Sequence, residues 1–367
     1  MERLNWHIAD ELSHHAQVLL IGPRGSAEQG PAAVPVVEVP LRPLPRFLLA
    51  SAWQAVAVAR HFKPHIVLAG SGLTAPAAWL AARASKARAH VYLHGLDAAV
   101  QHPVYRALWH PAIRHMDGVI ANSRPTADLA RNLGVDAEKI SIVHPGVTLP
   151  ATPQTAEALQ EFRQNHRLGG ARLLLSVGRL AARKGLLEFV QHALPSIVRK
   201  VPDTLLVIAG DAPANALLTH EQTRESIQVA ADAVGVGQHL RFLGRISEQE
   251  LTCAYESATL HIFPVRHRPG DPEGFGMVAI EAAAHGLPTV AFATGGIVDA
   301  VAEGQSGHLV APGDYAALAQ AAVRMLADSP YAWQTRASTF AVQFAWQAMG
   351  HKLWDILQES VIPQSKD

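Results

Sequence analysis

Short apolar runs alternate with longer, helix-like segments along the whole chain. The runs are three to six residues long, and the segments between them repeat apolar residues every three or four positions. This alternation is typical of a parallel β-sheet with helices on its faces. Strands are predicted at residues 18–21, 34–39, 66–69, 90–93, 118–121 and 140–143, and again at residues 173–177, 205–209, 240–243, 260–263, 289–292 and 308–310.

The pattern restarts after a Pro- and Thr-rich join at residues 149–155. A chain of 367 residues exceeds the size at which one core stops growing, so two domains are expected. We predict an α/β fold of two doubly wound domains: residues 1–150, joined by a C-terminal helix at 345–362, and residues 151–344. Ligands of such sheets bind beyond the carboxyl ends of the strands, so two facing domains predict an interdomain cleft.

Composition narrows the class of protein. Apolar residues make up 49% and charged residues 17%, as in globular proteins. Cys253 is the one cysteine, so no intrachain disulfide forms. The first 15 residues read as an amphipathic helix without a signal-peptide core, and the apolar stretch at 47–59 is too short for a membrane span. These features predict a cytoplasmic protein.

The stretch at residues 271–296, DPEGFGMVAIEAAAHGLPTVAFATGG, is the strongest candidate site. Its glycines allow close approach to a ligand, and the amides of Phe275, Gly276 and Met277 open a predicted helix that favours an anion. Glu273 and Glu281 flank that helix start. If both lie on one helix, eight steps of 1.5 Å place them roughly 12 Å apart, too far for a hydrolase acid/base pair. We therefore expect them to hold different parts of one extended ligand.

Basic residues follow the strand predicted at 173–177. In GRLAARKG, Arg179 and Lys184 offer a planar fork and a point charge, a combination suited to a diphosphate. The alternative is that both are ordinary solvated surface residues.

The first half offers three further features. His94 ends a predicted strand, where it could bind a sugar hydroxyl or transfer a proton. GSGLTA at residues 70–75 is similar to a dinucleotide fingerprint and supports an oxidoreductase alternative, but the acidic residue expected about 20 positions on is absent from AHVYLHG. The basic and aromatic segment at 42–63 is either a membrane-surface helix or a helix packed on its own sheet. Metal-ligand spacings and nucleic-acid motifs are lacking.

Several motifs together resemble the retaining glycosyltransferases of family 4, also called glycosyl transferases group 1, which have the GT-B fold of two facing Rossmann-like domains. The matching segments are GRLAARKG, IAGD at 208–211, FLGRIS at 242–247, EGFGMVAIE at 273–281, GLP at 286–288 and GG at 295–296. The approach to the glutamate loop, FPVRHRPGDPEGFG, is most similar to the phosphatidylinositol mannosyltransferase branch.

The resemblance implies roles for individual residues. Arg179 and Lys184 would bind the donor diphosphate as the leaving group, Glu273 would hold the transferred sugar, and Glu281 would bind the ribose. His94 would reach the donor sugar from the first domain. The remaining implied donor-binding residues are Gly178, Gly210, Arg245, Gly274, Phe275, Gly276 and Gly295.

The implied activity is transfer of a hexose, with mannose as the first guess, from a nucleotide sugar to a lipid-linked or polysaccharide acceptor. The donor would be GDP-mannose or a UDP-sugar, with no cofactor and no metal. The partners would be the nucleotide sugar, a glycan or glycolipid acceptor and, through peripheral contact, the inner face of the membrane. No nucleic acid is expected.

One departure from the family concerns the start of the chain. Members begin with a strand and a Gly-Gly loop before a helix similar to MERLNWHIADEL, so the first strand of the N-terminal sheet is expected to be missing. Its neighbours would then keep unpaired edges, and transfer would be slow until that strand is restored. Two alternatives stay open: a GT-B sugar-nucleotide epimerase and a non-catalytic nucleotide-sugar-binding subunit.

Overall fold

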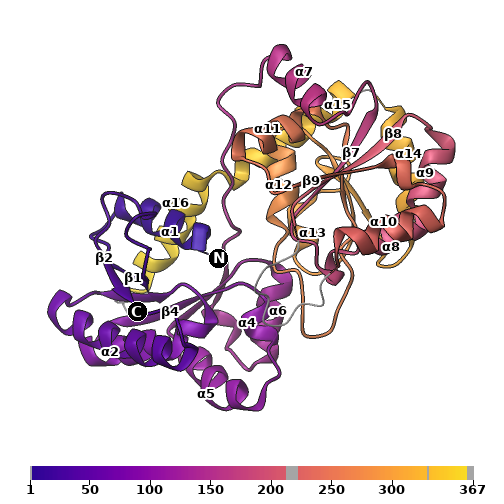
Figure 1. Cartoon of the computed structure of the whole chain (residues 1–367). Helices are drawn as coiled ribbons and strands as arrows, with labels where there is room; N and C mark the ends of the chain where they lie inside the picture. Colours follow the sequence, from indigo (N-terminus) through magenta and orange to yellow (C-terminus); the bar gives the residue numbers. More distant parts are fainter. Residues whose placement is uncertain (1, 212–221, 329, 362–367) are drawn as a thin grey trace. The chain divides into compact units, whose positions relative to one another are not determined.

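The computed structural model describes residues 2–211, 222–328 and 330–361 (Figure 1). They divide into two compact units: residues up to Gly146 together with those from Phe344 onward, and Val147–Gln343. Both units are built on parallel strands with helices on their faces, so the predicted α/β class is confirmed. All twelve predicted strands are present, with ends that shift by at most two residues.

The second unit contains one six-stranded parallel sheet in the order β12-β11-β10-β7-β8-β9. This is the order of a doubly wound sheet. Its strands are β7 (Arg172–Val177), β8 (Thr204–Ala209), β9 (Leu240–Gly244), β10 (Leu260–Phe263), β11 (Thr289–Phe292) and β12 (Gly307–Val310). Its helices are α7 (Ala156–Asn165), α8 (Leu186–His192), α9 (Leu194–Lys200), α10 (Arg224–Ala233), α11 (Glu248–Ser257), α12 (Met277–Ala284), α13 (Ile297–Ala300), α14 (Tyr315–Ala327) and α15 (Pro330–Ala341).

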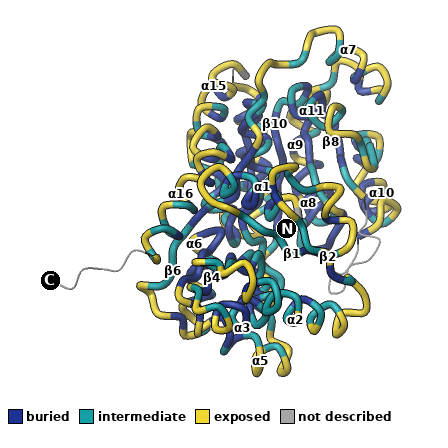
Figure 2. The backbone as a smooth tube through the Cα atoms, turned by 90° about the vertical axis from the view of Figure 1, so that its left-hand side faces the viewer, coloured by how far each residue is buried: buried dark blue, intermediate teal, exposed yellow. Residues whose placement is uncertain are grey.

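Side chains of this sheet are buried on both faces. Leu174 and Leu206 belong to one core cluster, whereas their chain neighbours Leu173 and Leu205 belong to another. Successive side chains of a strand point to opposite faces, so a strand covered on both sides reads as a continuous apolar run. Figure 2 shows β8 and β10, two inner strands of this sheet, in dark blue.

The first unit contains two parallel sheets. β1 (Leu20–Pro23) pairs with β2 (Val36–Val39), and the second sheet has the order β3-β4-β5-β6. The strands of this second sheet are β3 (Ile66–Ala69), β4 (Arg88–Leu93), β5 (Gly118–Ala121) and β6 (Ile140–Ile142). Among the described residues, the edge strands of these two sheets, β1, β2, β3 and β6, each pair on one side only.

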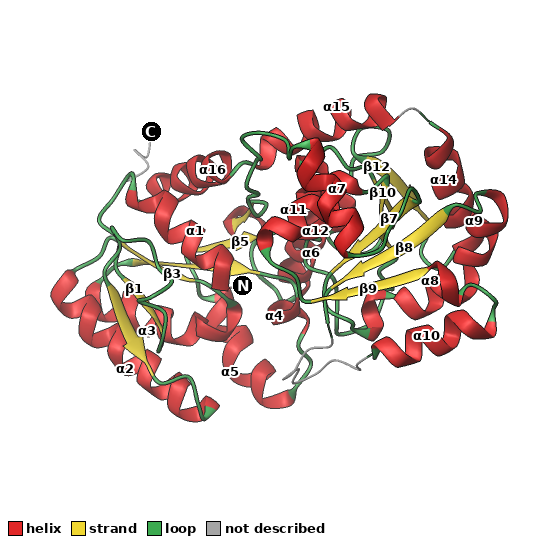
Figure 3. Ribbon diagram, turned by 45° about the horizontal axis from the view of Figure 1, so that its top comes forward, coloured by secondary structure: helices red, strands yellow, loops and turns green. Residues whose placement is uncertain are grey.

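Helices cover the first unit (Figure 3). They are α1 (Glu2–Ser13), α2 (Leu44–Phe62), α3 (Ala75–Ser85), α4 (Leu96–Ala99), α5 (Pro103–Arg114), α6 (Arg124–Asn132) and α16 (Trp346–Glu359). The last helix returns to pack on the first, and His7 stacks on Trp346 with ring centroids 3.8 Å apart. Within the described ranges, every helix lacks the length or the apolar content needed to cross a membrane.

Candidate active site

Two loops that the sequence analysis identified as candidate sites follow neighbouring strands of the six-stranded sheet in the second unit. The segment with Arg179 and Lys184 follows β7, the loop with Glu273 follows β10, and β7 and β10 are hydrogen-bonded neighbours. The sheet continues to β8 and β9 on one side of this pair and to β11 and β12 on the other. The chain therefore leaves the two strands in opposite directions. Doubly wound sheets bind their ligands at such a switch point.

Lys184 and Glu273 touch each other. Lys184 Nζ donates to Glu273 Oε2 at 2.8 Å, and the Arg183 guanidinium donates to the same oxygen. The side chains of Lys184 and Glu273 are only 13% and 11% exposed. This is a largely desolvated cluster rather than a surface ion pair, so the alternative of a solvated surface residue is wrong for Lys184.

The cluster keeps Glu273 ionised. Burial alone would raise the pKa of Glu273, but Lys184 and Arg183 outweigh it and hold the pKa below its usual value. Asp271 Oδ1 lies 3.4 Å from Arg183 Nε and balances the second cation. Burial lowers the pKa of Lys184, and the charge of Glu273 opposes this. The result is a carboxylate able to accept hydroxyl hydrogen bonds beside a cation able to meet a phosphate.

Aromatic rings lie next to the cluster. Lys184 Nζ lies 4.7 Å from the centroid of the Phe263 ring, and His261 stacks on Phe263 at 5.6 Å. His261 is fully buried, with Nδ1 3.0 Å from Thr289 Oγ1. Burial, with help from the charge of Lys184, lowers the pKa of His261 to about 3. A neutral His261 adds no further positive charge to the cluster of Lys184 and Arg183.

Glycines bring the backbones around Glu273 together. Gly296 N donates to Glu273 O at 2.9 Å, and a Cβ at Gly296 would lie 2.0 Å from Gly274 O. Gly295 has φ +53°. Gly276, with φ +92°, starts α12 in the left-handed region that glycine adopts at little cost. The GG and EGFG segments are therefore one packed unit, in which the Phe275 side chain is buried.

The other predicted donor-binding positions lie at the ends of β7, β8 and β9. Gly210 has φ +131°, and a Cβ there would lie 2.0 Å from Gly178 O, so these two loop starts approach closely. Arg179 and Arg245 follow β7 and β9, and both are exposed. Burial is the main cause that lowers the pKa of Lys184, and the charges of Arg183 and Arg179 add to it. Arg179 is therefore close enough to Lys184 to interact with it electrostatically.

Glu281 lies on α12 and is half-buried, whereas Glu273 precedes the helix. The estimate that placed both glutamates on one helix is therefore wrong, because α12 begins only at Met277. Tyr255 Oη donates to Glu281 Oε2 at 3.1 Å, and the Tyr255 ring stacks on His285 at 5.3 Å. Glu281 has the partner that a half-buried carboxylate requires.

Family models match both parts of the chain. The model described as "Glycosyltransferase Family 4" matches residues 1–149, and "Glycosyl transferases group 1" matches residues 159–339. A Mycobacterium tuberculosis relative, "GDP-mannose-dependent alpha-(1-6)-phosphatidylinositol monomannoside mannosyltransferase", is 30% identical over 296 residues, covering 78% of this chain and 74% of the relative. This chain belongs to the family 4 glycosyltransferases.

Other relatives and solved structures extend the likeness. The chain spans about half of a 31% identical Mycolicibacterium smegmatis relative of the same name, with coverages of 58% and 54%. The crystal structure of Anabaena HepE in complex with UDP has a TM-score of 0.81 at 20% identity, covering 98% of this glycosyltransferase and 96% of HepE. A glycosyltransferase from Rickettsia africae has a TM-score of 0.82 at 21% identity, with coverages of 99% and 95%. These structures show the GT-B fold.

In the first unit of this glycosyltransferase, His94 lies where β4 ends. Its Nε2 is 2.8 Å from Gly70 O, and its backbone N donates to Asp97 Oδ1 at 2.9 Å. Asp97 Oδ2 also accepts from Gly72 N at 2.8 Å, and a Cβ at Gly72 would lie 2.8 Å from Asp97 Cβ. The GSG glycines thus serve this local packing. Burial lowers the pKa of His94, which favours a neutral ring.

Four residues of this candidate site were not predicted from the sequence: Arg183, Tyr255, His261 and Asp271. Arg183 is adjacent to Lys184, and Asp271 opens the DPEGFG loop. Both are charged residues within the two candidate segments, so an ion pair between these segments could have been predicted. Tyr255 and His261 carry no local signal, because their partners are distant in sequence. Within the described ranges, no group of three or more His, Cys, Asp or Glu could hold a metal ion.

Proposed function

We propose that this family 4 glycosyltransferase transfers a hexose from a nucleoside diphosphate sugar to a glycan or glycolipid acceptor, with retention of anomeric configuration. The contact between Lys184 and Glu273 carries the proposal. In a nucleotide sugar, the anomeric carbon is bonded directly to an oxygen of the diphosphate. A site for such a donor needs a phosphate-binding cation and a hydroxyl-binding carboxylate side by side, as these two residues are.

The chemistry follows from that arrangement. When the bond between the anomeric carbon and the phosphate oxygen breaks, negative charge grows on the departing diphosphate. Lys184 and Arg179 neutralise it, while Glu273 orients the sugar through its hydroxyls. Glu281, held by Tyr255, binds the ribose. The departing phosphate accepts the proton of the attacking acceptor hydroxyl, so the proposal requires neither a protein nucleophile nor a metal.

We propose mannose, carried by GDP, as the transferred sugar. The mycobacterial relatives are named as GDP-mannose-dependent enzymes, at 30% to 31% identity. A glycogen synthase at 33% identity and a HepE structure in complex with UDP-glucose favour a UDP-sugar instead. The acceptor class proposed from the mannosyltransferase relatives is a lipid-linked sugar, reached by peripheral contact with the inner face of the membrane. A His94 side chain in contact with the donor sugar is part of the same proposal.

The test offers the purified chain GDP-mannose or UDP-glucose, with and without a phosphatidylinositol mannoside acceptor. Mass spectrometry detects the product, and proton NMR reports the configuration of the new bond. We expect an acceptor-dependent product with retained configuration and release of nucleoside diphosphate. Inverted configuration contradicts the mechanism. An epimerised nucleotide sugar formed without acceptor indicates the epimerase alternative, and donor binding without any turnover indicates the binding subunit.

A further inference from the structure

Helix α2 is more apolar than its burial explains. Ala, Val, Leu, Phe and Trp occupy 13 of its 19 positions, yet only Ser51 and Ala59 are buried. Leu49 and Trp53 are 73% and 72% exposed. A helix that is apolar on most sides is normally covered by protein or lipid. The helix does pack against α3, but this contact leaves the Leu49 and Trp53 side uncovered.

The neighbouring helices extend the apolar surface. Leu80 of α3 is 44% exposed, and Val104 and Leu108 of α5 are 53% and 60% exposed. Of the fourteen large apolar side chains found exposed in the described ranges, nine lie between Leu41 and Leu108. A concentration of this kind marks an interaction surface.

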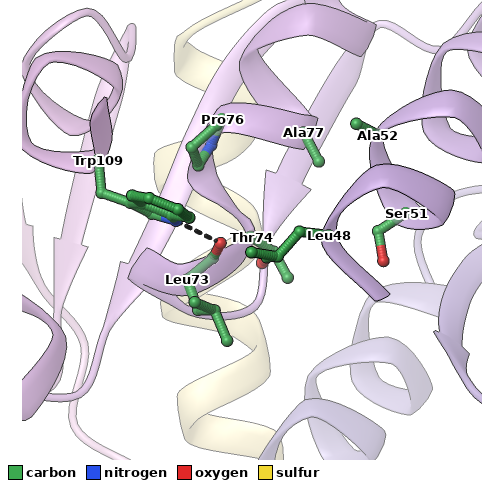
Figure 4. Close-up of a pocket in the computed structure, with 8 residues that line it drawn as sticks. All are labelled: Leu48, Ser51, Ala52, Leu73, Thr74, Pro76, Ala77 and Trp109. Atoms are coloured by element: carbon green, nitrogen blue, oxygen red, sulfur yellow. Dashed lines mark hydrogen bonds between the residues drawn. The ribbon is translucent and has the colours of Figure 1, made fainter. Parts of the chain in front are cut away.

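A small cavity lies where these three helices meet. In Figure 4, Leu48 and Ala52 of α2 lie across from Pro76 and Ala77 at the start of α3, with Trp109 of α5 beside them. Trp109 Nε1 donates to Leu73 O at 2.8 Å, so the indole is held with its ring against this apolar junction. The lining of this small cavity is almost entirely apolar, so the cavity continues the apolar surface of the three helices.

The charge of this region is strongly one-sided. From the start of α2 to the end of α5, residues 44–114, the sequence contains eight Arg and Lys residues but a single carboxylate, Asp97, in a chain that is neutral as a whole. One of the eight, Arg88, is paired with Asp117. The Asp97 carboxylate accepts hydrogen bonds from Gly72 N and His94 N, so its two oxygens bind backbone groups of the same unit. Helices α2, α3 and α5 contain no acidic residue.

Basic and apolar side chains share one side of α2. Arg46, Leu49, Trp53 and Arg60 follow one another at spacings of three, four and seven residues, which places them along one stripe of the helix. All four are exposed. A stripe with guanidinium groups at both ends and Leu and Trp between them suits a bilayer interface, where Trp lies at headgroup depth and Arg meets phosphates.

We propose that the exposed surface of α2, with the adjoining parts of α3 and α5, docks on a lipid bilayer with anionic headgroups. The proposal rests on the proposed function, in which the acceptor is lipid-linked and the enzyme contacts the membrane peripherally. It adds which surface of the first unit makes that contact. A second copy of the chain fits less well, because a two-fold interface on α2 would bring the same arginines together.

The test is co-sedimentation of the purified chain with phosphatidylcholine vesicles, with and without phosphatidylglycerol. We expect binding to the anionic vesicles, weakening as salt rises. Arg46→Glu with Arg60→Glu should abolish binding, and Leu49→Ser with Trp53→Ser should weaken it by about tenfold at fixed salt, since two exposed apolar side chains leave the bilayer. Matched controls in the other unit, Arg199→Glu and Tyr331→Ser, change exposed residues of the same kinds and should bind like the parent.

Three results would overturn the proposal: equal binding to neutral and anionic vesicles, equal loss of binding in the control variants, or no vesicle binding together with a dimer that Trp53→Ser dissociates. Circular dichroism confirms that each variant is folded. A nucleotide-induced shift in melting temperature reports the donor site independently. If the chain binds anionic vesicles but no nucleotide, the docking surface is supported and the proposed function is contradicted. If it binds nucleotide but no vesicles, only the docking surface is contradicted.

Discussion

At the scale of single residues, Glu273 is decisive because two buried cations depend on its charge. Glu273→Gln keeps the shape but leaves Lys184 and Arg183 with Asp271 as their one remaining counter-charge in the cluster. We expect kcat/KM for transfer to fall by roughly 100-fold and the free energy of unfolding to fall by about 1–3 kcal/mol. Glu157→Gln, at an exposed glutamate on α7, is the control. Unchanged turnover in the Glu273 variant would remove this residue from the proposed chemistry.

Tyr255 is a positioning residue for Glu281. Tyr255→Phe removes the hydroxyl that donates to Glu281 and keeps the ring stacked on His285. Loss of one such hydrogen bond costs about 1 kcal/mol, so KM for the nucleotide sugar should rise by roughly fivefold while kcat changes little. Steady-state kinetics measure this, with Tyr331→Phe as the exposed control. A fall in kcat at constant KM would indicate that Tyr255 does not act through donor binding.

At the scale of elements, the loop after β11 holds the loop of Glu273 in place. A Cβ at Gly296 would lie 2.0 Å from Gly274 O, so Gly296→Ala must push the two loops apart. Overpacking of this kind costs about 1–3 kcal/mol. We expect donor affinity to fall at least tenfold in calorimetric titration while the circular dichroism spectrum stays native. Gly170→Ala, where a Cβ would meet nothing within 4 Å, should behave like the parent. Equal affinities in the two variants would contradict the support role.

The strands and the site differ in how far sequence reasoning reaches. Every strand was predictable from a short apolar run, and the signal is continuous in strands such as β8, β10 and β11 that are buried on both faces. The carboxyl ends of β7 and β10 were predictable as ligand-binding places, because ligands of doubly wound sheets bind beyond the carboxyl ends of the strands. The cluster itself was not, since Lys184 and Glu273 are 89 residues apart and their contact depends on which strands become neighbours. The sequence also left open whether α2 packs on its own sheet or is exposed, because this depends on how far each of its residues is buried in the fold.

At the scale of the whole molecule, buried histidines make stability depend on pH. His261 has a pKa of about 3, against 6.5 as its ordinary value. The depressed pKa means that the unfolded chain takes up a proton that the folded chain excludes, so stability is full above pH 6.5 and falls as the pH drops toward 3. Between pH 7 and pH 5 this amounts to roughly 2 kcal/mol.

Denaturant unfolding at pH 7 and pH 5 measures this dependence. His261→Gln should lose less stability than the parent between the two pH values, even if the variant is weaker at pH 7. His61→Gln, at an exposed histidine of α2, should keep the slope of the parent. Equal slopes in the parent and the His261 variant would show that His261 is not held neutral in the folded state.

The central claim is that the Lys184 and Glu273 cluster binds a nucleoside diphosphate sugar at its phosphate–sugar junction. The most direct measurement is the melting temperature with GDP, UDP, GDP-mannose and UDP-glucose, compared between the parent, Lys184→Met and the surface control Lys200→Met. A ligand present at 100 times its Kd stabilises the folded chain by about 2.7 kcal/mol. We predict a rise for the parent and the control with at least one nucleotide sugar, and none for Lys184→Met. An equal rise in all three proteins, or a rise in none, would contradict the account.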